Sequence, residues 1–333
     1  MNLPLPIRIL LWPLSAAWGI FTRLRAWSYA RGWLQRRRLN GIVISVGNLT
    51  VGGTGKTPLV LWIAERLLAQ GKRVAILSRG YRGSRGTSDE VELMRERLGT
   101  RAAFGVGGNR FVEGKRLEEE GIDVFLLDDG FQHLQLTRDL DIVLVDATRP
   151  ERREWLLPAG RLREPRSALN RADLVVFTRM ENQDLALLAM QRVAKFPIFP
   201  ATTRLLGFRV HSGDRSLKTP AELGGDHFFA FCGIGNARAF FQDLERWGVV
   251  LAGSATFRDH HRYTTEDVER LERNAVRAGA KALVTTEKDA QNLRQAGFVR
   301  FPVFIAVIEL AIPDEKQFLK VISAKLGARG AAA

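Results

Sequence analysis

Residues 45–60, SVGNLTVGGTGKTPLV, have the residue types of a phosphate-binding loop. Glycines would let consecutive backbone N–H groups face a phosphate, Lys56 would neutralise the β- and γ-phosphates, and Thr57 would bind Mg²⁺. The general pattern starts with a glycine at position 50, where this chain has Thr50. We still favour a nucleoside triphosphate site over a mere glycine-rich turn, because an apolar run precedes the loop and a helical pattern follows it. The predicted nucleotide-binding residues are Gly52, Gly53, Thr54, Gly55, Lys56 and Thr57.

A second set of polar residues follows the apolar run at residues 124–127. The sequence VFLLDDGFQH places Asp128 and Asp129 at the end of this run, with Gln132 and His133 close behind. A phosphate-binding loop needs a carboxylate from a neighbouring strand to hold Mg²⁺, so the two acids are predicted metal ligands. Asp146, in IVLVDATRP, is the alternative, but we expect it only to cap the turn that follows.

Two further clusters could activate a group that accepts a phosphoryl group. One is SDE at residues 88–90, and the other is FRDHHRY at residues 257–263, where two of the five histidines stand next to Asp259. A kinase needs a base near the acceptor hydroxyl, which such residues can supply. We do not favour a metal site at the two histidines, since no third ligand stands at helical spacing. A GTPase is also disfavoured, because the sequence nearest to N-K-x-D is TTEKD at residues 285–289, which lacks the Asn.

Alternating strands and helices must position these groups. Short apolar runs separated by helical patterns predict a parallel sheet with helices on both faces. In the first half we expect a helix at residues 56–70 and strands at residues 42–46, 74–77, 124–127, 142–145 and 174–177. In the second half we expect helices at residues 237–246, 264–278 and 313–326, and strands at residues 227–232, 249–251, 282–286 and 303–307.

The predicted fold class is therefore α/β. A P-loop domain with a doubly wound, mostly parallel sheet is expected at residues 39–205. A second, smaller α/β domain at residues 206–333 would complete the active-site cleft. Residues 1–38 would form an N-terminal amphipathic helix, rich in Arg and Trp, ahead of both domains.

Composition and net charge limit which classes of protein this chain can belong to. The chain has 333 residues, of which 46% are hydrophobic and 26% charged, so it can form a globular core and is not a disordered chain. Its one cysteine, Cys232, excludes an intramolecular disulfide and a Cys-rich metal cluster, which is typical of a reducing compartment. The formal net charge is +14, and half of it comes from seven arginines within residues 1–38, a segment without any acid. This concentration predicts an anionic surface as a partner.

The N-terminal segment indicates which anionic surface this is. Its uncharged run at residues 9–22 is 14 residues long, shorter than the roughly 20 residues that a membrane-spanning helix needs. Ile20, Leu24 and Trp27 recur at helical spacing, with the arginines displaced from them, as in a helix that lies in a membrane interface. Nucleic-acid binding would not need this much exposed Trp and Leu. A cleaved signal peptide and a helix packed on the protein's own core are the alternatives.

Taken together, six motifs resemble the tetraacyldisaccharide 4′-kinases, the lipid A 4′-kinases of Gram-negative bacteria. The motifs are GNLTVGGTGKTP, SRGY, DDGFQH, LPAGRLREP, DHHRY and TEKD, and they keep the family's order along most of the chain. The resemblance implies ATP-dependent phosphorylation of the 4′-hydroxyl of a tetraacylated glucosamine disaccharide 1-phosphate, giving lipid IV-A in lipid A biosynthesis. It also implies a peripheral or monotopic location at the cytoplasmic face of the bacterial inner membrane. The expected partners are the lipid substrate and the anionic membrane surface, with no nucleic acid.

The same resemblance implies roles for individual residues. Asp89 would be the base that takes the hydroxyl proton, supported by His260, and Lys56 would neutralise the phosphates of ATP. If Asp89 and His260 lie on different halves of the chain, a cleft must close to bring them together. Mg²⁺ would be held around Thr57, Asp128, Asp129 and Glu164, while Arg79, Gln132 and His133 would face the substrate.

Two other classes of function use fewer of these features. A membrane-associated P-loop ATPase or switch protein needs only the P-loop and the basic N-terminal segment. A nucleic-acid-binding ATPase rests on the net charge of +14 alone.

Overall fold

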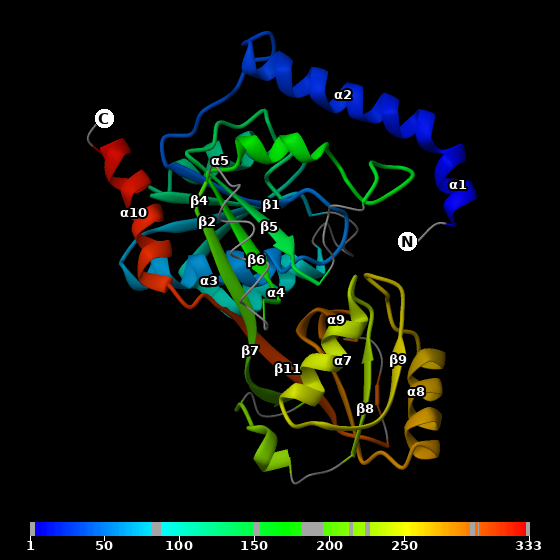
Figure 1. Ribbon diagram of the computed structural model, residues 1–333. Helices are drawn as coiled ribbons and strands as arrows, with labels where there is room; N and C mark the ends of the chain where they lie inside the picture. Colours follow the sequence, from blue (N-terminus) through cyan, green and yellow to red (C-terminus); the bar gives the residue numbers. More distant parts are fainter. Residues whose placement is uncertain are drawn as a thin grey trace. The chain divides into compact units, whose positions relative to one another are not determined.

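The computed structural model describes residues 4–80, 88–148, 154–180, 196–212, 216–223, 227–293, 297–298 and 300–330. The chain divides into two compact units. The first unit comprises Met1–Gly80, Leu98–Thr202 and Leu310–Ala333, and the second comprises Tyr81–Arg97 and Thr203–Glu309. Both units are built on parallel strands and helices (Figure 1). This division differs from the expected ranges 39–205 and 206–333, because residues 81–97 belong to the second unit and residues 310–333 to the first.

The first unit contains the doubly wound sheet that the sequence predicts. Its strand order is β3-β2-β4-β1-β5-β6-β7, and each neighbouring pair is parallel. All seven residues of β1 and of β5 are buried, as expected for central strands that helices cover on both faces. The strands are β1(Ile42–Asn48), β2(Val74–Ser78), β3(Ala102–Val106), β4(Val124–Asp128), β5(Leu140–Asp146), β6(Leu174–Thr178) and the first part of β7(Ile198–Val210).

The helices of the first unit explain why the C-terminal segment belongs to it. Besides the N-terminal helices, the α-helices among its described residues are α3(Lys56–Ala69), α5(Arg110–Glu118) and α10(Glu315–Gly330). In α3, Leu59, Ile63 and Leu67 are buried, at the helical spacing seen in the sequence. The ring of Phe318 in α10 packs edge-on against Trp62 of α3 and Phe199 of β7, with centroids 5.4 and 5.0 Å apart. The C-terminal helix therefore packs into the core of the first unit.

The second unit has the strand order β11-β10-β8-β9, again with parallel pairs, and the second part of β7 lies beside β11. In β8, Phe228 and Ala230 face the core formed with α7, while Phe229 and Phe231 face the core formed with α8. The elements are α4(Asp89–Leu98), β8(His227–Cys232), α7(Ala237–Arg246), β9(Val250–Thr256), α8(Thr265–Arg277), β10(Ala282–Thr286), α9(Glu287–Asn292) and β11(Val303–Ala311).

The N-terminal helices α1(Leu5–Leu10) and α2(Trp12–Ala30) expose most of their apolar side chains (dark blue in Figure 1). The buried residues of α2 are the small ones, Ser15, Gly19 and Thr22, and the hydroxyl of Ser15 donates to the carbonyl oxygen of Leu156 at 3.0 Å. The helix thus packs on the first unit through a small, partly polar face. Among the described helices, none combines the length and apolar character needed to cross a bilayer. The exposed apolar side chains include Leu5, Ile9, Leu10, Trp12, Leu14, Ile20, Phe21, Leu24 and Trp27.

Candidate active site

The loop between β1 and α3 has the backbone conformation of a phosphate-binding loop. Gly52 and Gly55 have φ values of 118° and 88°, in the region that favours glycine. Gly55 caps α3, so the unpaired N–H groups of the first helical turn follow directly behind the loop. A Cβ on Gly52 or Gly53 would meet no atom within 4 Å, which leaves the space beside this backbone open to a ligand.

Thr50, the residue that departs from the general pattern, lies in an extended segment. It forms an antiparallel bridge with Leu162, and the N–H of Val51 donates to the carbonyl oxygen of Arg161 at 2.8 Å. Any residue can adopt an extended backbone, so this loop does not need a glycine at its entry.

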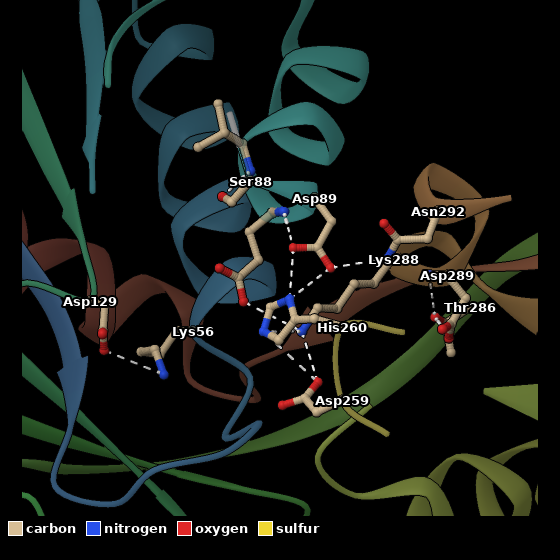
Figure 2. Close-up of polar contacts among 12 residues, drawn as sticks. Lys56, Ser88, Asp89, Asp129, Asp259, His260, Thr286, Lys288, Asp289 and Asn292 are labelled. Carbon is tan, nitrogen blue, oxygen red and sulfur yellow. Dashed lines mark hydrogen bonds and ion pairs between the residues drawn. The ribbon is translucent and has the colours of Figure 1, made fainter. Parts of the chain in front are cut away.

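Lys56 is held in place by partners at the ends of two neighbouring strands, Asn48 in β1 and Asp129 just after β4. Its Nζ lies 3.5 Å from Oδ1 of Asp129 (Figure 2). It also donates to Oδ1 of Asn48 at 3.2 Å. Asp129 also pairs with Nη1 of Arg163 at 2.6 Å. Burial acts to raise the pKa of Asp129, but Lys56 and Arg163 outweigh it and lower the pKa to about 2. Asp129 is therefore ionised at neutral pH and positions Lys56 at the loop.

The other acids near the phosphate-binding loop differ in what they contact. Asp128 is buried at the end of β4, in register with Val46 of β1, so its backbone lies beside the strand that leads into the loop. Asp146 accepts hydrogen bonds from the N–H and the hydroxyl of Thr148, at 3.0 and 2.6 Å. This confirms the expectation that Asp146 caps a turn.

Glu164 makes a bidentate pair with Arg171. Its two carboxylate oxygens lie 2.8 and 3.0 Å from the guanidinium nitrogens, and the guanidinium of Arg171 stacks over the ring of Phe131. Both oxygens of Glu164 are thus engaged. Its role as a metal ligand stays a prediction, and it requires Arg171 to release one oxygen.

Gln132 and His133 both lie beside the P-loop strand and its arginines. The amide nitrogen of Gln132 donates to the carbonyl oxygen of Asn48 at 3.0 Å. Nδ1 of His133 lies 3.3 Å from a guanidinium nitrogen of the buried Arg110. Arg79 is exposed at the end of β2, and its charge acts on His133 as well. The three predicted substrate-contacting residues, Arg79, Gln132 and His133, therefore belong to the first unit.

We expect His133 to stay neutral well below the usual range for histidine. Burial and the charges of Arg110 and Arg138 lower the pKa of His133 to about 4, whereas the hydrogen bond with Asp89 raises the pKa of His260. In an NMR titration of the ring protons from pH 8 to pH 5, His260 should take up its proton first and His133 should hardly shift. A His133→Gln variant assigns the signal. A His133 midpoint near 6.5 would contradict this expectation.

A second cluster of functional groups lies entirely in the second unit. Nδ1 of His260 lies 2.9 Å from Oδ1 and 3.0 Å from Oδ2 of Asp89 (Figure 2). Burial acts to raise the pKa of Asp89, but the hydrogen bond from His260 and the charge of Lys288 outweigh it and lower the pKa. The structure thus brings together the two residues predicted as base and supporting histidine. They lie in one unit, so no closure is needed to pair them.

The loop that carries His260 is fixed by a buried carboxylate. The N–H of His260 donates to the carbonyl oxygen of Gly233 at 3.1 Å. Asp289 in turn accepts from the N–H of Gly233 and the hydroxyl of Tyr263, both at 2.8 Å. Asp289, from the TEKD motif, therefore ties together the two backbone segments that position His260.

The two adjacent histidines have different partners. Nε2 of His261 lies 2.7 Å from Asp267, a residue of the capping box that begins α8, and its ring stacks on Phe257. His261 therefore belongs to the framework, while His260 faces Asp89.

This difference predicts separate effects of substitution. His261→Ala should lower the free energy of unfolding by about 1–2 kcal/mol, because the Asp267 hydrogen bond and the ring contact are lost, with little change in kcat. His260→Ala should lower kcat at least tenfold, since Asp89 loses its orienting partner. Thermal unfolding and steady-state kinetics of the two variants test this. A larger loss of kcat in His261→Ala would reverse the assignment.

The residues at the P-loop suit Mg²⁺, a hard cation that prefers oxygen ligands. Asp129 is ionised, Asp128 is buried at the end of the adjacent strand, and the hydroxyl of Thr57 lies in the first turn of α3. Asp89, Glu90 and His260 also offer three close ligand atoms. However, the ammonium of Lys288 lies 3.2 Å from His260 and 3.5 Å from Glu90, so this second cluster already has a cation.

Comparison with known proteins identifies the family. The family model described as tetraacyldisaccharide-1-P 4′-kinase, LpxK, matches residues 7–327. The chain belongs to the tetraacyldisaccharide-1-P 4′-kinase family. Among relatives, the tetraacyldisaccharide 4′-kinases of Geobacter metallireducens and Geobacter sulfurreducens are each 40% identical to it. The first match covers 91% of the chain and 94% of the relative, and the second covers 89% and 87%.

A solved structure of the LpxK family shares the fold. The crystal structure of "apo" form LpxK from Aquifex aeolicus in complex with ATP matches with a TM-score of 0.76 and 30% identity. The match covers 96% of this chain and 99% of that chain. The resemblance inferred from the motifs is therefore confirmed, and so is the P-loop kinase fold.

Sequence reasoning about this LpxK family member missed several residues that contact the predicted site. Arg163 pairs with Asp129, Arg110 contacts His133, and Lys288 contacts His260. Arg163 lies in LPAGRLREP and Lys288 in TEKD, so each of these two residues belongs to a motif that the sequence analysis had already singled out. The motifs did not say which of their side chains would point at the predicted site residues.

Proposed function

We propose that the chain transfers the terminal phosphate of ATP to the 4′-hydroxyl of a tetraacyldisaccharide 1-phosphate, producing lipid IV-A. The observation that carries the proposal is the hydrogen-bonded pair of Asp89 and His260 in a chain that also has a P-loop, with Gly52 and Gly55 at positive φ. Family membership supports the choice of lipid and of ATP. A carboxylate beside an imidazole is what deprotonation of an acceptor hydroxyl requires, whereas a switch ATPase has no need of it.

The P-loop would bind the phosphates of ATP. Gly52, Gly53, Thr54 and Gly55 would offer backbone N–H groups, and Lys56 would neutralise charge that builds up as the phosphate is transferred. Mg²⁺ held by Thr57, Asp128 and Asp129 would neutralise the phosphate oxygens. These residues support the proposal because Lys56 already lies beside an ionised Asp129.

Asp89 would take the proton of the lipid hydroxyl. Its lowered pKa keeps it ionised at neutral pH, so it can act as an acceptor. A carboxylate with a low pKa is a weak base, and the hydrogen bond to His260 compensates by orienting it and by stabilising the charge redistribution during the transfer. Arg79, Gln132 and His133 are proposed to contact the phosphates or the sugar.

A direct assay tests the proposed function. Purified protein is incubated with labelled ATP, Mg²⁺ and tetraacyldisaccharide 1-phosphate in detergent, and the lipid fraction is analysed. The expected result is a lipid carrying one more phosphate, at the 4′ position. ATP turnover that is equally fast without the lipid, and no labelled lipid, would favour a membrane-associated P-loop ATPase instead. Binding to oligonucleotides at moderate salt would favour the nucleic-acid-binding class.

We also propose that α1 and α2 hold the protein on the anionic surface of the inner membrane, at its cytoplasmic face. Ile20 and Leu24 are 56% and 57% exposed, which is unusual for large apolar side chains of a packed helix. The guanidinium of Arg31 lies 5.5 Å from the ring centroid of Trp27. A positive charge next to a tryptophan ring suits the headgroup layer of an anionic bilayer. Such a position would place the protein where its lipid substrate is embedded.

The vesicle-binding test follows from this exposure. Ile20→Ser and Leu24→Ser should each weaken partitioning onto phosphatidylglycerol-containing vesicles about tenfold, because each removes apolar area that would be buried in the interface. Val276→Ser is the matched control, since Val276 is 53% exposed but lies on α8. Co-sedimentation measures the binding. Equal losses for all three variants, or no loss for any, would refute the proposed docking surface.

A further inference from the structure

We propose that Lys288 is a positioning residue that fixes the tautomer of His260. The proposal deepens the function proposed above, since it concerns the side chain that supports the predicted base. Lys288 lies in the first turn of α9, and its ammonium has three acceptors in reach (Figure 2). Oδ1 of Asp259 is 3.1 Å away, Nε2 of His260 is 3.2 Å away, and Oε1 of Glu90 is 3.5 Å away.

The chemistry of the donors assigns the proton on His260. A lysine ammonium has three donors and no acceptor, so Nε2 of His260 must accept the contact with Lys288. The ring proton of a neutral imidazole then has to be on Nδ1, which lies 2.9 Å from Asp89. In this tautomer His260 donates to Asp89. The other tautomer would put an N–H against the ammonium and leave Nδ1 without a proton for the carboxylate.

The charge of Lys288 also acts on the imidazole. The hydrogen bond with Asp89 raises the pKa of His260 above its usual value, although burial and the ammonium of Lys288 act to lower it. Burial acts to lower the pKa of Lys288, but Glu90, Asp89 and Asp259 outweigh it and raise the pKa, so the lysine stays charged. Lys288 is thus the charged side chain that opposes formation of an imidazolium at His260.

The backbone under Lys288 is fixed, as a positioning role requires. The preceding residue, Glu287, is buried and makes a bidentate pair with Arg97 of α4, with both distances 2.8 Å. The same guanidinium donates to the carbonyl oxygen of Ile308. The helix that carries Asp89 and the helix that carries Lys288 are therefore joined through Arg97 and Glu287. A lysine that served only to neutralise Asp259 and Glu90 would not need this alignment with Nε2.

The test measures the state of His260 directly, by nitrogen and proton NMR of the full chain without any substrate. At pH values above the pKa of His260, the protein should show the Nδ1–H tautomer. In Lys288→Met, the Nδ1–H signature should be lost or mixed, and the pKa of His260 should rise by roughly one unit, as expected for a unit charge removed from about 3 Å. Lys281→Met, which changes an exposed lysine of the same unit, should behave like the unchanged protein.

A second variant separates tautomer from charge and guards against misfolding of Lys288→Met. Lys288→Gln keeps an N–H donor for Nε2 but has no charge, so it should retain the Nδ1–H tautomer while the pKa of His260 still rises. An unchanged tautomer and an unchanged pKa in folded Lys288→Met, or an unchanged pKa in Lys288→Gln, would overturn the proposal.

Kinetics then separates this proposal from the proposed function. If Asp89 is the base and needs a neutral His260, the acidic limb of the pH profile of kcat should move upward in Lys288→Gln by the same amount as the pKa of His260. The KM for ATP should stay within twofold. If the NMR changes occur and the kcat profile does not move, the role of Lys288 stands and the assignment of Asp89 as base fails.

Discussion

Lys56→Ala should lower kcat/KM for phosphoryl transfer by about 10²–10³-fold, the typical loss when one charged group that stabilises a transition state is removed. Lys56 is the P-loop cation, and its Nζ is held by Asn48 and Asp129 before any phosphate is present. The fall should appear mainly in kcat, because the negative charge that Lys56 neutralises grows during the transfer.

The control for this prediction is Lys72→Ala, which removes an exposed lysine of the same unit just beyond the end of α3. It should leave both kcat and KM unchanged. Circular dichroism and thermal unfolding confirm that each variant is folded. A Lys56→Ala enzyme with near-normal kcat would mean that the assignment of the P-loop as the ATP site is wrong.

The second large effect is expected for Asp89→Asn. Asparagine keeps the shape of the side chain and can still accept a hydrogen bond from Nδ1 of His260, but it cannot take a proton. The kcat should fall by about 10²–10⁴-fold, the range for loss of a general base, while the affinity for ATP should hardly change. Glu92→Gln, on the same helix, is the matched control and should keep its activity.

Ionisation of Asp89 should make the stability of the fold depend on pH in one direction. Its pKa is lowered in the folded protein, so its ionisation stabilises the fold above the unfolded pKa, and this contribution is lost as the pH falls through the folded pKa. Between those two values the unchanged protein should lose stability relative to Asp89→Asn. Thermal unfolding across this acidic range measures the difference. If kcat of Asp89→Asn were unchanged at neutral pH, the role of base would pass to another carboxylate, with Glu90 the nearest in sequence.

Much of the fold could be predicted because the core strands have a simple pattern. The run at β1 is Val and Ile apart from Ser45, with Gly47 and Asn48 at its end, and it is buried throughout. The strand β3 could not be recognised, since AAFGV has two alanines and a glycine in five residues and only part of it is buried. The place of residues 310–333 was also missed, because periodicity shows that a helix exists but not which core its Phe318 will enter.

The site was predictable to the level of motifs. Lys56, Asp129 and the Asp89–His260 pair lie where their motifs indicate, because glycines, adjacent acids and adjacent histidines are rare enough to be noticed. Single basic residues such as Arg163 and Lys288 are not rare enough to be noticed, because the chain has 50 Lys and Arg residues. Their contacts depend on loop and helix geometry that spacing alone does not contain. His261 shows the same limit, since only the structure separates it from His260.

The division of the chain into units also has a consequence for folding. Asp89 and His260 are 171 residues apart in sequence, yet they belong to the same unit because residues 81–97 leave the first unit between β2 and β3. During synthesis, β1, the P-loop and α3 can form early, while α4 must wait for β8, β10 and α9 to be made before it finds its partners. The P-loop would therefore be assembled before Asp89, the proposed base, has its histidine. A nascent or truncated chain that ends before β8 would carry Asp89 without the partner that orients it.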